Sequence, residues 1–133
     1  MARAHLTHEL VVKLPNRIGL LADVGEVIRE AGVNIVAIGA YRKEDRGEFM
    51  IVTSDNAAAA TALERLNADV AEHTAVAVEL SDEPGALESV ARAIAEAGID
   101  MRWAYASVAS GAGTALAIFK TEDDARAVNV LTQ

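Results

Sequence analysis

The sequence contains no cysteine and only two prolines among its 133 residues. The lack of cysteine excludes disulfide bonds, thiolate catalysis and zinc sites built on cysteine. No stretch approaches 18 uninterrupted apolar residues, and residues 1–5 lack the apolar region of a secretory signal. We therefore expect a cytoplasmic protein with no membrane partner. Because hydrophobic residues make up 52% of the sequence, we expect a packed globular fold.

Basic residues are also scarce, with 12 Lys and Arg against 20 Asp and Glu, which gives a formal net charge of −8. Residues 1–66 carry 8 basic and 9 acidic side chains, whereas residues 67–133 carry 4 and 11. Such a balance repels phosphate backbones, and neither half contains a basic stripe. Nucleic acid is therefore not expected as a partner.

The strongest feature that is present is an internal repeat. The stretch Leu14–Leu21 is matched 66 residues later by Leu80–Leu87, and Glu30–Ile35 is matched at the same spacing by Glu96–Met101. Each copy has the pattern of a strand, a glycine turn, an amphipathic helix, a glycine stop and a second strand. The sequence therefore predicts two copies of one small unit.

The first copy contains enough sequence for five further features. We predict a strand over His5–Leu14, a helix from Gly19 to Gly32, strands over Val33–Tyr41 and Glu48–Thr53, and a helix over Ala57–Leu66 capped by residues 54–56. A fourth strand over Val70–Thr74 is either short or runs straight into the first strand of the second copy.

The second copy repeats this order but ends early. We predict a helix from Gly85, strands over Ile99–Val108 and Thr114–Lys120 with a turn at Ser110–Gly113, and a last helix from about Glu122. No sequence is left for a fourth strand at the C-terminus. The predicted fold class is α+β, with two ferredoxin-like βαββαβ units that have antiparallel sheets and helices on one face. The predicted domains are residues 1–72 and residues 73–133.

The turn Asp82-x-Pro84-Gly85-x-Leu87, the helix after it and the stretch Glu96–Asp100 resemble the ACT domain family. The whole chain is similar to small stand-alone proteins made of two tandem ACT domains. The resemblance implies a regulatory module that binds free amino acids at the glycine turn and at the start of the second strand. The first copy departs from the family pattern, because residues 16–19 replace the usual acidic residue and proline.

The two turns also have chemistry that suits an amino acid. A helix N-terminus offers unpaired backbone N–H groups and the positive end of the helix dipole, which favour an α-carboxylate. Asn34 or Asp100 can accept hydrogen bonds from an α-ammonium group. The candidate ligand-binding residues are Asn16, Ile18, Gly19, Leu20, Leu21, Asn34 and Ile35 in the first copy, and Asp82, Pro84, Gly85, Ala86, Leu87, Asp100 and Met101 in the second.

The helix between these groups limits how a ligand can be held. About 13 residues at ~1.5 Å each carry the chain roughly 20 Å from each turn to Asn34 or Asp100. One ligand can touch both groups only if two units contribute to the site. We therefore expect sites at interfaces between ACT units, within the chain or across a homodimer.

A purely structural interpretation of the same residues stays open. In that case Gly19 and Gly85 only form tight turns, and Asn16 and Asp82 only cap helices. Catalysis finds little support, since His73 is a lone histidine in a connector. We expect a non-enzymatic protein, without a cofactor or a metal, that binds free amino acids. The alternative is a regulatory docking subunit of an amino-acid biosynthetic enzyme, without a ligand of its own.

Overall fold

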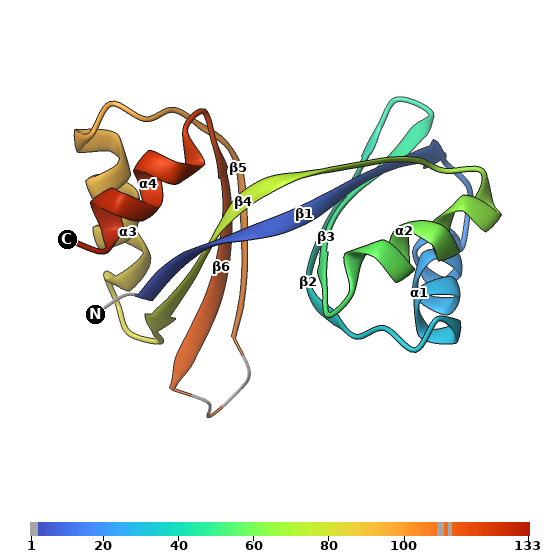
Figure 1. Cartoon of the computed structure of the whole chain (residues 1–133), viewed down its shortest axis with the longest axis horizontal. Helices are drawn as coiled ribbons and strands as arrows, with labels where there is room; N and C mark the ends of the chain where they lie inside the picture. Colours follow the sequence, from blue (N-terminus) through green and yellow to red (C-terminus); the bar gives the residue numbers. More distant parts are fainter. Residues whose placement is uncertain (1–2, 109–110, 112) are drawn as a thin grey trace. The chain divides into compact units, whose positions relative to one another are not determined.

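The computed structural model describes residues 3–108, 111 and 113–133, and within them the chain forms six strands and four α-helices (Figure 1). The first half holds β1 (Arg3–Pro15), α1 (Leu20–Glu30), β2 (Ile35–Lys43), β3 (Arg46–Thr53), α2 (Asn56–Leu63) and a short 3₁₀ helix, η1 (Glu64–Leu66). The second half holds β4 (Asp69–Ser81), α3 (Ala86–Glu96), β5 (Met101–Val108), β6 (Thr114–Thr121) and α4 (Asp124–Leu131). The predicted α+β class is therefore confirmed.

The chain divides into two compact units, and β1 and β4 each contribute residues to both. The first unit is His8–His73, and the second unit combines residues 3–7 with Thr74–Gln133. The strand order is β2-β3-β1-β4-β6-β5. Strand β3 pairs antiparallel with β1 and β2, and β6 pairs antiparallel with β4 and β5. The first unit thus has the ferredoxin-like order βαββαβ, and the second unit follows the same order as far as α4.

The helix α1 packs on the sheet of the first unit because its apolar residues fall on one side. Its buried side chains are spaced three or four residues apart along most of the helix, and they are Leu20, Val24, Val27 and Ile28. They join strand residues in one apolar cluster that includes Leu10, Val12, Leu14, Phe49 and Ile51. Burial of side chains of this size contributes about 1.5–3 kcal/mol each, so this cluster holds the helix on the sheet.

The second helix of the first unit begins at the predicted cap. The Asp55 carboxylate accepts a hydrogen bond from the backbone N–H of Ala58 at 3.1 Å. The helix predicted over Ala57–Leu66 is α2 followed by η1, since the last turn tightens into a 3₁₀ helix and ends at Asn67 with φ 57°.

Strand β4 settles the alternative that the sequence left open at Val70–Thr74. The strand runs without a break from Asp69 to Ser81, so the last strand of the first unit continues directly into the first strand of the second. This continuity follows from the β-branched and alanine run after His73, which contains no turn residue.

The strand that the sequence analysis found missing comes from the beginning of the chain. Residues 3–7 of β1 belong to the second unit, where Ala4 packs against the apolar cluster of that unit. Arg3 Nη2 also forms an ion pair with Glu79 Oε2 on β4 at 3.0 Å. The cluster that Ala4 joins is built on Val76, Val90, Ile94 and Phe119, among others.

Part of the turn predicted at Ser110–Gly113 lies outside the described residues, namely Ser110 and Ala112. The two glycines of this turn, Gly111 and Gly113, both have φ 77°. Across the ranges that the structure describes, no helix is long and apolar enough to cross a membrane.

Candidate functional site

The first glycine turn leaves the start of α1 open. Gly19 has φ 87°, a left-handed conformation that glycine adopts without a steric penalty. The backbone N–H of Leu20 donates to the carbonyl of Arg17 at 3.3 Å, and the N–H of Asp23 donates to the carbonyl of Gly19 at 3.0 Å. Within the described part of the chain, the N–H groups of Leu21 and Ala22 have no acceptor, and no side chain caps the helix.

The second glycine turn repeats this geometry at the start of α3. Gly85 also has φ 87°, and the N–H of Ala86 donates to the carbonyl of Glu83 at 3.2 Å. The N–H groups of Leu87 and Glu88 have no acceptor among residues 3–108, 111 and 113–133, and again no side chain caps the helix. The interpretation of Asn16 and Asp82 as mere helix caps therefore does not hold, because neither side chain makes the capping hydrogen bond.

A hollow of about 290 Å³ lies beside the first turn. It is lined by Asn16, Gly19, Leu20 and Leu21 of the predicted site, together with Arg17, Tyr41 and Arg42, among others. Arg17 Nη1 pairs with Asp23 Oδ2 at 2.6 Å, which holds one guanidinium group beside the first turn of α1. Burial raises the pKa of Tyr41, and the hydrogen bond from its hydroxyl to Glu48 raises it further, so this phenol stays protonated at neutral pH.

A second hollow of about 390 Å³ lies beside the other turn. It is lined by Pro84, Gly85 and Ala86 of the predicted site, together with Ser81, Glu83 and Glu88, among others. The two hollows therefore share a helix N-terminus and differ in charge. Two arginines line the first, and two glutamates line the second.

The remaining predicted residues lie in other places. Ile18 and Leu87 are exposed beside their turns, with Ile18 fully open to solvent, and Asp82 is tied to the hairpin by its N–H, which donates to the Gly113 carbonyl at 3.0 Å. Asn34 and Asp100 do not line either hollow. They follow the C-terminal ends of α1 and α3, whose 11 residues span about 16 Å.

Backbone bonds hold the strand starts in place at that far end. The N–H of Asn34 donates to Ser54 Oγ at 2.9 Å, and the Asp100 side chain accepts from the N–H of Met101 at 3.0 Å. Ile35 packs on the apolar cluster of the first unit, and Met101 packs on that of the second. Neither unit thus brings its own turn and its own strand start together, as the helix length predicts.

The side chains that give each hollow its charge were not among the predicted site residues. Arg17 and Glu83 lie inside the repeated turns, so their opposite charges could have been read there. Arg42 could not, because it reaches the first hollow through the pairing of β2 with β3, where it lies opposite Gly47.

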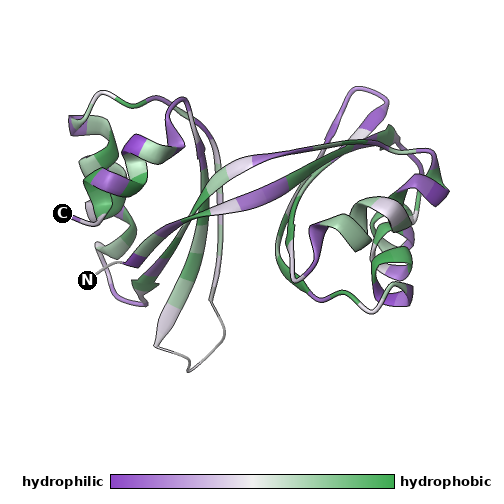
Figure 2. Cartoon of the chain, viewed as in Figure 1, coloured by the Kyte–Doolittle hydropathy of each residue, from purple (hydrophilic) through white to green (hydrophobic). Residues whose placement is uncertain are grey.

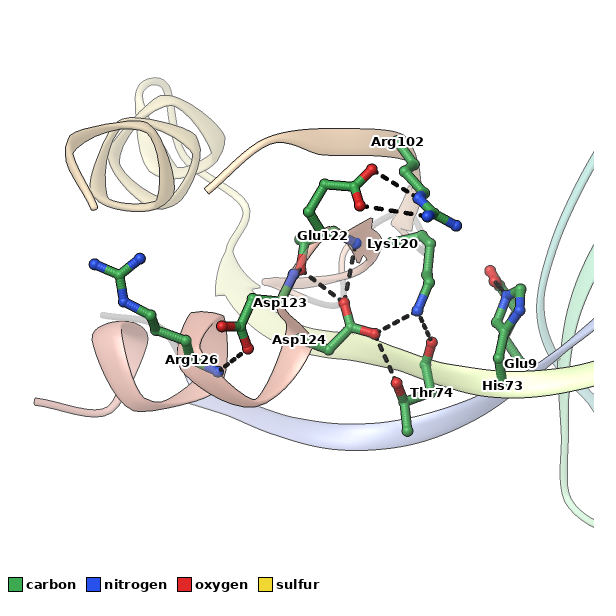
Figure 3. A network of polar contacts seen from close by, with 10 residues as sticks. Glu9, His73, Thr74, Arg102, Lys120, Glu122, Asp123, Asp124 and Arg126 are labelled. Atoms are coloured by element: carbon green, nitrogen blue, oxygen red, sulfur yellow. Dashed lines mark hydrogen bonds and ion pairs between the residues drawn. The ribbon is translucent and has the colours of Figure 1, made fainter. Parts of the chain in front are cut away.

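A buried polar network lies in the second unit, away from the turn (Figure 3). Asp124 Oδ2 accepts from Lys120 Nζ at 2.6 Å and from Thr74 Oγ1 at 2.7 Å, while Oδ1 accepts from the N–H and the hydroxyl of Thr121. Burial alone would raise the pKa of Asp124, but these hydrogen bonds outweigh it and lower the pKa below the ordinary value. The carboxylate therefore stays charged and fully bonded, which suits a structural role.

Solved structures of other proteins share this fold. Protein BT0572 from Bacteroides thetaiotaomicron is similar with a TM-score of 0.86 and 23% sequence identity, over 97% of this chain and 88% of that chain. The ligand-free regulatory subunit of aspartate kinase from Thermus thermophilus is similar with a TM-score of 0.71 and 16% identity, over 99% of this chain and 95% of that one. The corresponding subunit from Thermus flavus has a TM-score of 0.66 and 15% identity, over 99% and 95%.

Sequence comparison shows what the first unit resembles. Among curated protein sequences, none matches this chain. The family model of the ACT domain matches residues 8–71, which coincide with the first unit within two residues. Residues 8–71 are therefore similar to ACT domains.

Proposed function

We propose that this protein is a regulatory amino-acid sensor and that the second unit, residues 3–7 with Thr74–Gln133, is a second ACT domain beside residues 8–73. The observation that carries the proposal is the pair of glycine turns at Gly19 and Gly85, where two backbone N–H groups at each helix start have no acceptor in the described residues. An α-carboxylate is the group that such a helix start binds best, because the N–H groups and the helix dipole both favour an anion.

The α-ammonium group needs a second set of residues. Asn34 and Asp100 can accept its hydrogen bonds, but each lies at the far end of an 11-residue helix from its own turn. In our proposal a homodimer joins the turn of one chain to the strand start of a second chain. Ligand binding then stabilises the pairing of chains, which is how a cytoplasmic sensor of this type would signal.

The charge at the two turns gives the sites different affinities in this proposal. The first hollow is lined by Arg42, which attracts a carboxylate, and by Arg17, which is already paired with Asp23. The second is lined by Glu83, which repels one, and by Glu88, which is paired with Arg92 at 3.2 Å. The first turn is therefore the tighter site for an α-carboxylate.

Thermal unfolding in the presence of each of the twenty free amino acids tests the proposal directly. A ligand at ~100 times its dissociation constant adds ~2.7 kcal/mol to the free energy of unfolding, which raises Tm by several degrees in a protein of this size. We expect such a shift with one or a few amino acids. If no amino acid shifts Tm at millimolar concentration, the sensor proposal is wrong.

Glycine substitutions with a matched control test the sites. Gly19→Leu or Gly85→Leu places a side chain where the ligand carboxylate must approach, and we expect the ligand-induced Tm shift to fall at that site. Gly111→Leu is the control, because this glycine also has positive φ, 77°, and no atom within 4 Å of an added Cβ. The control suffers the same backbone strain but lies on the turn between β5 and β6, outside the proposed binding residues.

The strand starts are tested in the same assay. Asp100→Leu removes the proposed acceptor for the ammonium group while leaving Gly85 in place, so we expect weaker binding with the fold intact. If Gly85→Leu and Asp100→Leu both bind as tightly as the unchanged protein, the assignment of these residues is wrong.

The likeness to regulatory subunits of aspartate kinase favours a second candidate function. In that case the chain is a docking subunit that regulates an amino-acid biosynthetic enzyme and has no ligand of its own. This candidate predicts an unchanged Tm with all amino acids and co-purification with an enzyme that has its own catalytic site. A ligand-dependent Tm of the isolated chain would argue against it.

A further inference from the structure

A hollow of about 380 Å³ lies in the first unit beside the hairpin that joins β2 and β3, which is hydrophilic in Figure 2. Its lining contains two apolar residues, Leu14 and Pro15, and charged residues of both signs, which are Lys13, Asp45, Arg46 and Asp69. None of these residues lines the hollow beside the Gly19 turn. The mixture of an apolar surface with opposite charges is what a small zwitterion requires.

The ammonium group of Lys13 is available to a ligand because the carboxylate opposite it, Glu48, is already hydrogen-bonded to other residues. Lys13 lies opposite Glu48 in the pairing of β1 with β3. Glu48 Oε1 accepts from the Tyr41 hydroxyl at 3.0 Å, and Glu48 Oε2 accepts from Arg46 at 3.2 Å. Among the residues that the structure describes, Lys13 therefore has no ion-pair partner.

The equivalent place in the second unit also holds a hollow, of about 310 Å³, but its charged residues are paired with one another. Arg3 and Glu79 stand 66 residues away from Asp69 and Lys13, respectively, and at both places β1 carries the basic residue and β4 the acidic one. Arg3 and Glu79 pair directly at 3.0 Å, so they neutralise one another. Asp69 and Lys13 form no such pair in the described chain, which leaves the Lys13 ammonium group and the carboxylates of Asp69 and Asp45 unpaired on the lining of the first hollow.

We infer that this hollow binds the main-chain groups of a free α-amino acid, at a site separate from the glycine turns. Lys13 receives the α-carboxylate, while Asp69, with Asp45 on the hairpin, receives the α-ammonium group. Leu14 and Pro15 contact the aliphatic part of the ligand. Lys13 pairs with the carboxylate of the ligand, and the two aspartates pair with its ammonium group. A ligand with only one of these two charges therefore leaves part of the lining without a partner.

The experiment is an NMR titration of the full-length protein with L-alanine, compared with propionate and ethylamine. Propionate keeps the carboxylate of alanine and lacks the ammonium group, whereas ethylamine keeps the ammonium group and lacks the carboxylate. We expect L-alanine to shift the backbone amide signals of Lys13, Asp45 and Asp69, and each half-ligand to bind at least about tenfold more weakly. The recognised groups belong to every α-amino acid, so the probe does not depend on a particular side chain.

Lys13→Met and Asp69→Asn are the test variants, because each removes one charge and keeps the length of the side chain. Both should weaken the L-alanine response at the hollow by about tenfold or more. Glu79→Gln, at the equivalent place in the second unit, is the matched control and should leave that response unchanged. The proposal is overturned if L-alanine does not shift the three amides, or if propionate alone shifts them as strongly.

The same titration separates this inference from the proposed sensor function. Binding at the glycine turns shifts the amides of Leu21 and Leu87, which lie outside the hollow. Shifts at Lys13 and Asp69 without shifts at the turns would support the inference and count against the turns. The reverse pattern would support the turns alone.

Discussion

The two units carry different side chains at the same position of the fold, which is the first residue of the helix that follows β3 or β6. In the first unit, the Asn56 side chain accepts from the N–H and the hydroxyl of Thr53 at 3.1 and 2.7 Å. In the second unit, Asp124 accepts from the same two groups of Thr121 at 2.9 and 2.7 Å. The spacing between the equivalent residues is 68 in both cases.

The two side chains differ in how the carbonyl of the neighbouring strand receives its hydrogen bond. The Asn56 amide donates to the carbonyl of His8 at 3.0 Å, so one neutral group reaches the strand. Asp124 cannot donate, and Lys120 supplies the missing donor by bonding both Asp124 and the Thr74 carbonyl at 2.6 and 2.8 Å. In both units a strand carbonyl at this place needs a hydrogen-bond donor, and either an amide or a lysine held in a buried ion pair can supply it.

The largest expected effect concerns how each unit obtains its fourth strand. The first unit, His8–His73, is continuous, whereas the second takes residues 3–7 from the other end of the chain. We expect a fragment of residues 8–73 to fold alone and a fragment of residues 74–133 to remain unfolded, because it leaves one edge of β4 unpaired and lacks Ala4 in its core. Circular dichroism and NMR of the two fragments measure this difference.

A permuted fragment serves as the control for that experiment. Residues 1–7 joined by a flexible linker after Gln133 should restore folding to residues 74–133. Cooperative folding of residues 74–133 without residues 1–7 would show that the borrowed strand is dispensable.

The next largest effect concerns Asp124 and Asn56. Lys120 and Asp124 are both buried, at 9% and 6% exposure. Asp124→Ala leaves a buried ammonium group without its carboxylate and should lower the free energy of unfolding by about 3–5 kcal/mol. Asn56→Ala removes the hydrogen bonds of a neutral amide, one of them to the exposed Glu72 carboxylate at 3.1 Å, and should lower it by about 1–3 kcal/mol. Urea unfolding of both variants gives the comparison.

A double variant can transfer the arrangement of the first unit to the second. Val52 stands where Lys120 stands, so Lys120→Val with Asp124→Asn recreates the residues of the first unit. The new amide can then donate to the Thr74 carbonyl, as Asn56 does to His8. We expect the double variant to be more stable than Asp124→Asn alone. The opposite order would mean that the two positions are not equivalent.

Acid should weaken the second unit through Asp124. Its pKa is lower in the folded protein than in the unfolded chain, so its contribution is fully present above the unfolded value of about 3.9 and is lost as pH falls through the folded value. The stability difference between the unchanged protein and Asp124→Asn should therefore shrink as the pH falls below about 4. Urea midpoints across this range measure it, and a constant difference would contradict the role of the charge.

The arrangement of each unit could be predicted because it depends on local patterns. The apolar spacing of α1 and the glycine at position 32 are visible in the sequence, and both repeat at α3. The segment that supplies the fourth strand of the second unit could not be predicted. Residues 3–7 and the part of β4 with which they pair lie about 75 residues apart, and five residues are too few to show a strand pattern of their own.

The residues of the candidate site were likewise predicted only in part. Gly19 and Gly85 were predicted because a left-handed turn before a helix favours glycine, and both have φ 87°. Tyr41 and Arg42 were missed, since they reach the first hollow only through the pairing of β2 with β3. Side chains brought together by strand register leave no spacing pattern in the sequence.

The smallest expected effect concerns Gly47, which faces the start of α1. A Cβ at Gly47 would lie 2.5 Å from Leu20 Cδ2, and Leu20 is buried. In the second unit the equivalent residues are Ala115 and Ala86, so the larger side chain on the strand accompanies a smaller one on the helix. Gly47→Ala should lower the free energy of unfolding by about 1 kcal/mol through overpacking, because Leu20 Cδ2 is the end of a flexible side chain that can shift.

A double-mutant cycle tests whether the two positions compensate. In a Leu20→Ala background the added methyl group has room, so Gly47→Ala should then be close to neutral. Urea unfolding of the four proteins gives the coupling free energy between the two sites. If Gly47→Ala lowers stability equally in both backgrounds, its effect comes from the strand backbone. The smaller helix residue of the second unit would then not compensate for the larger residue on its strand.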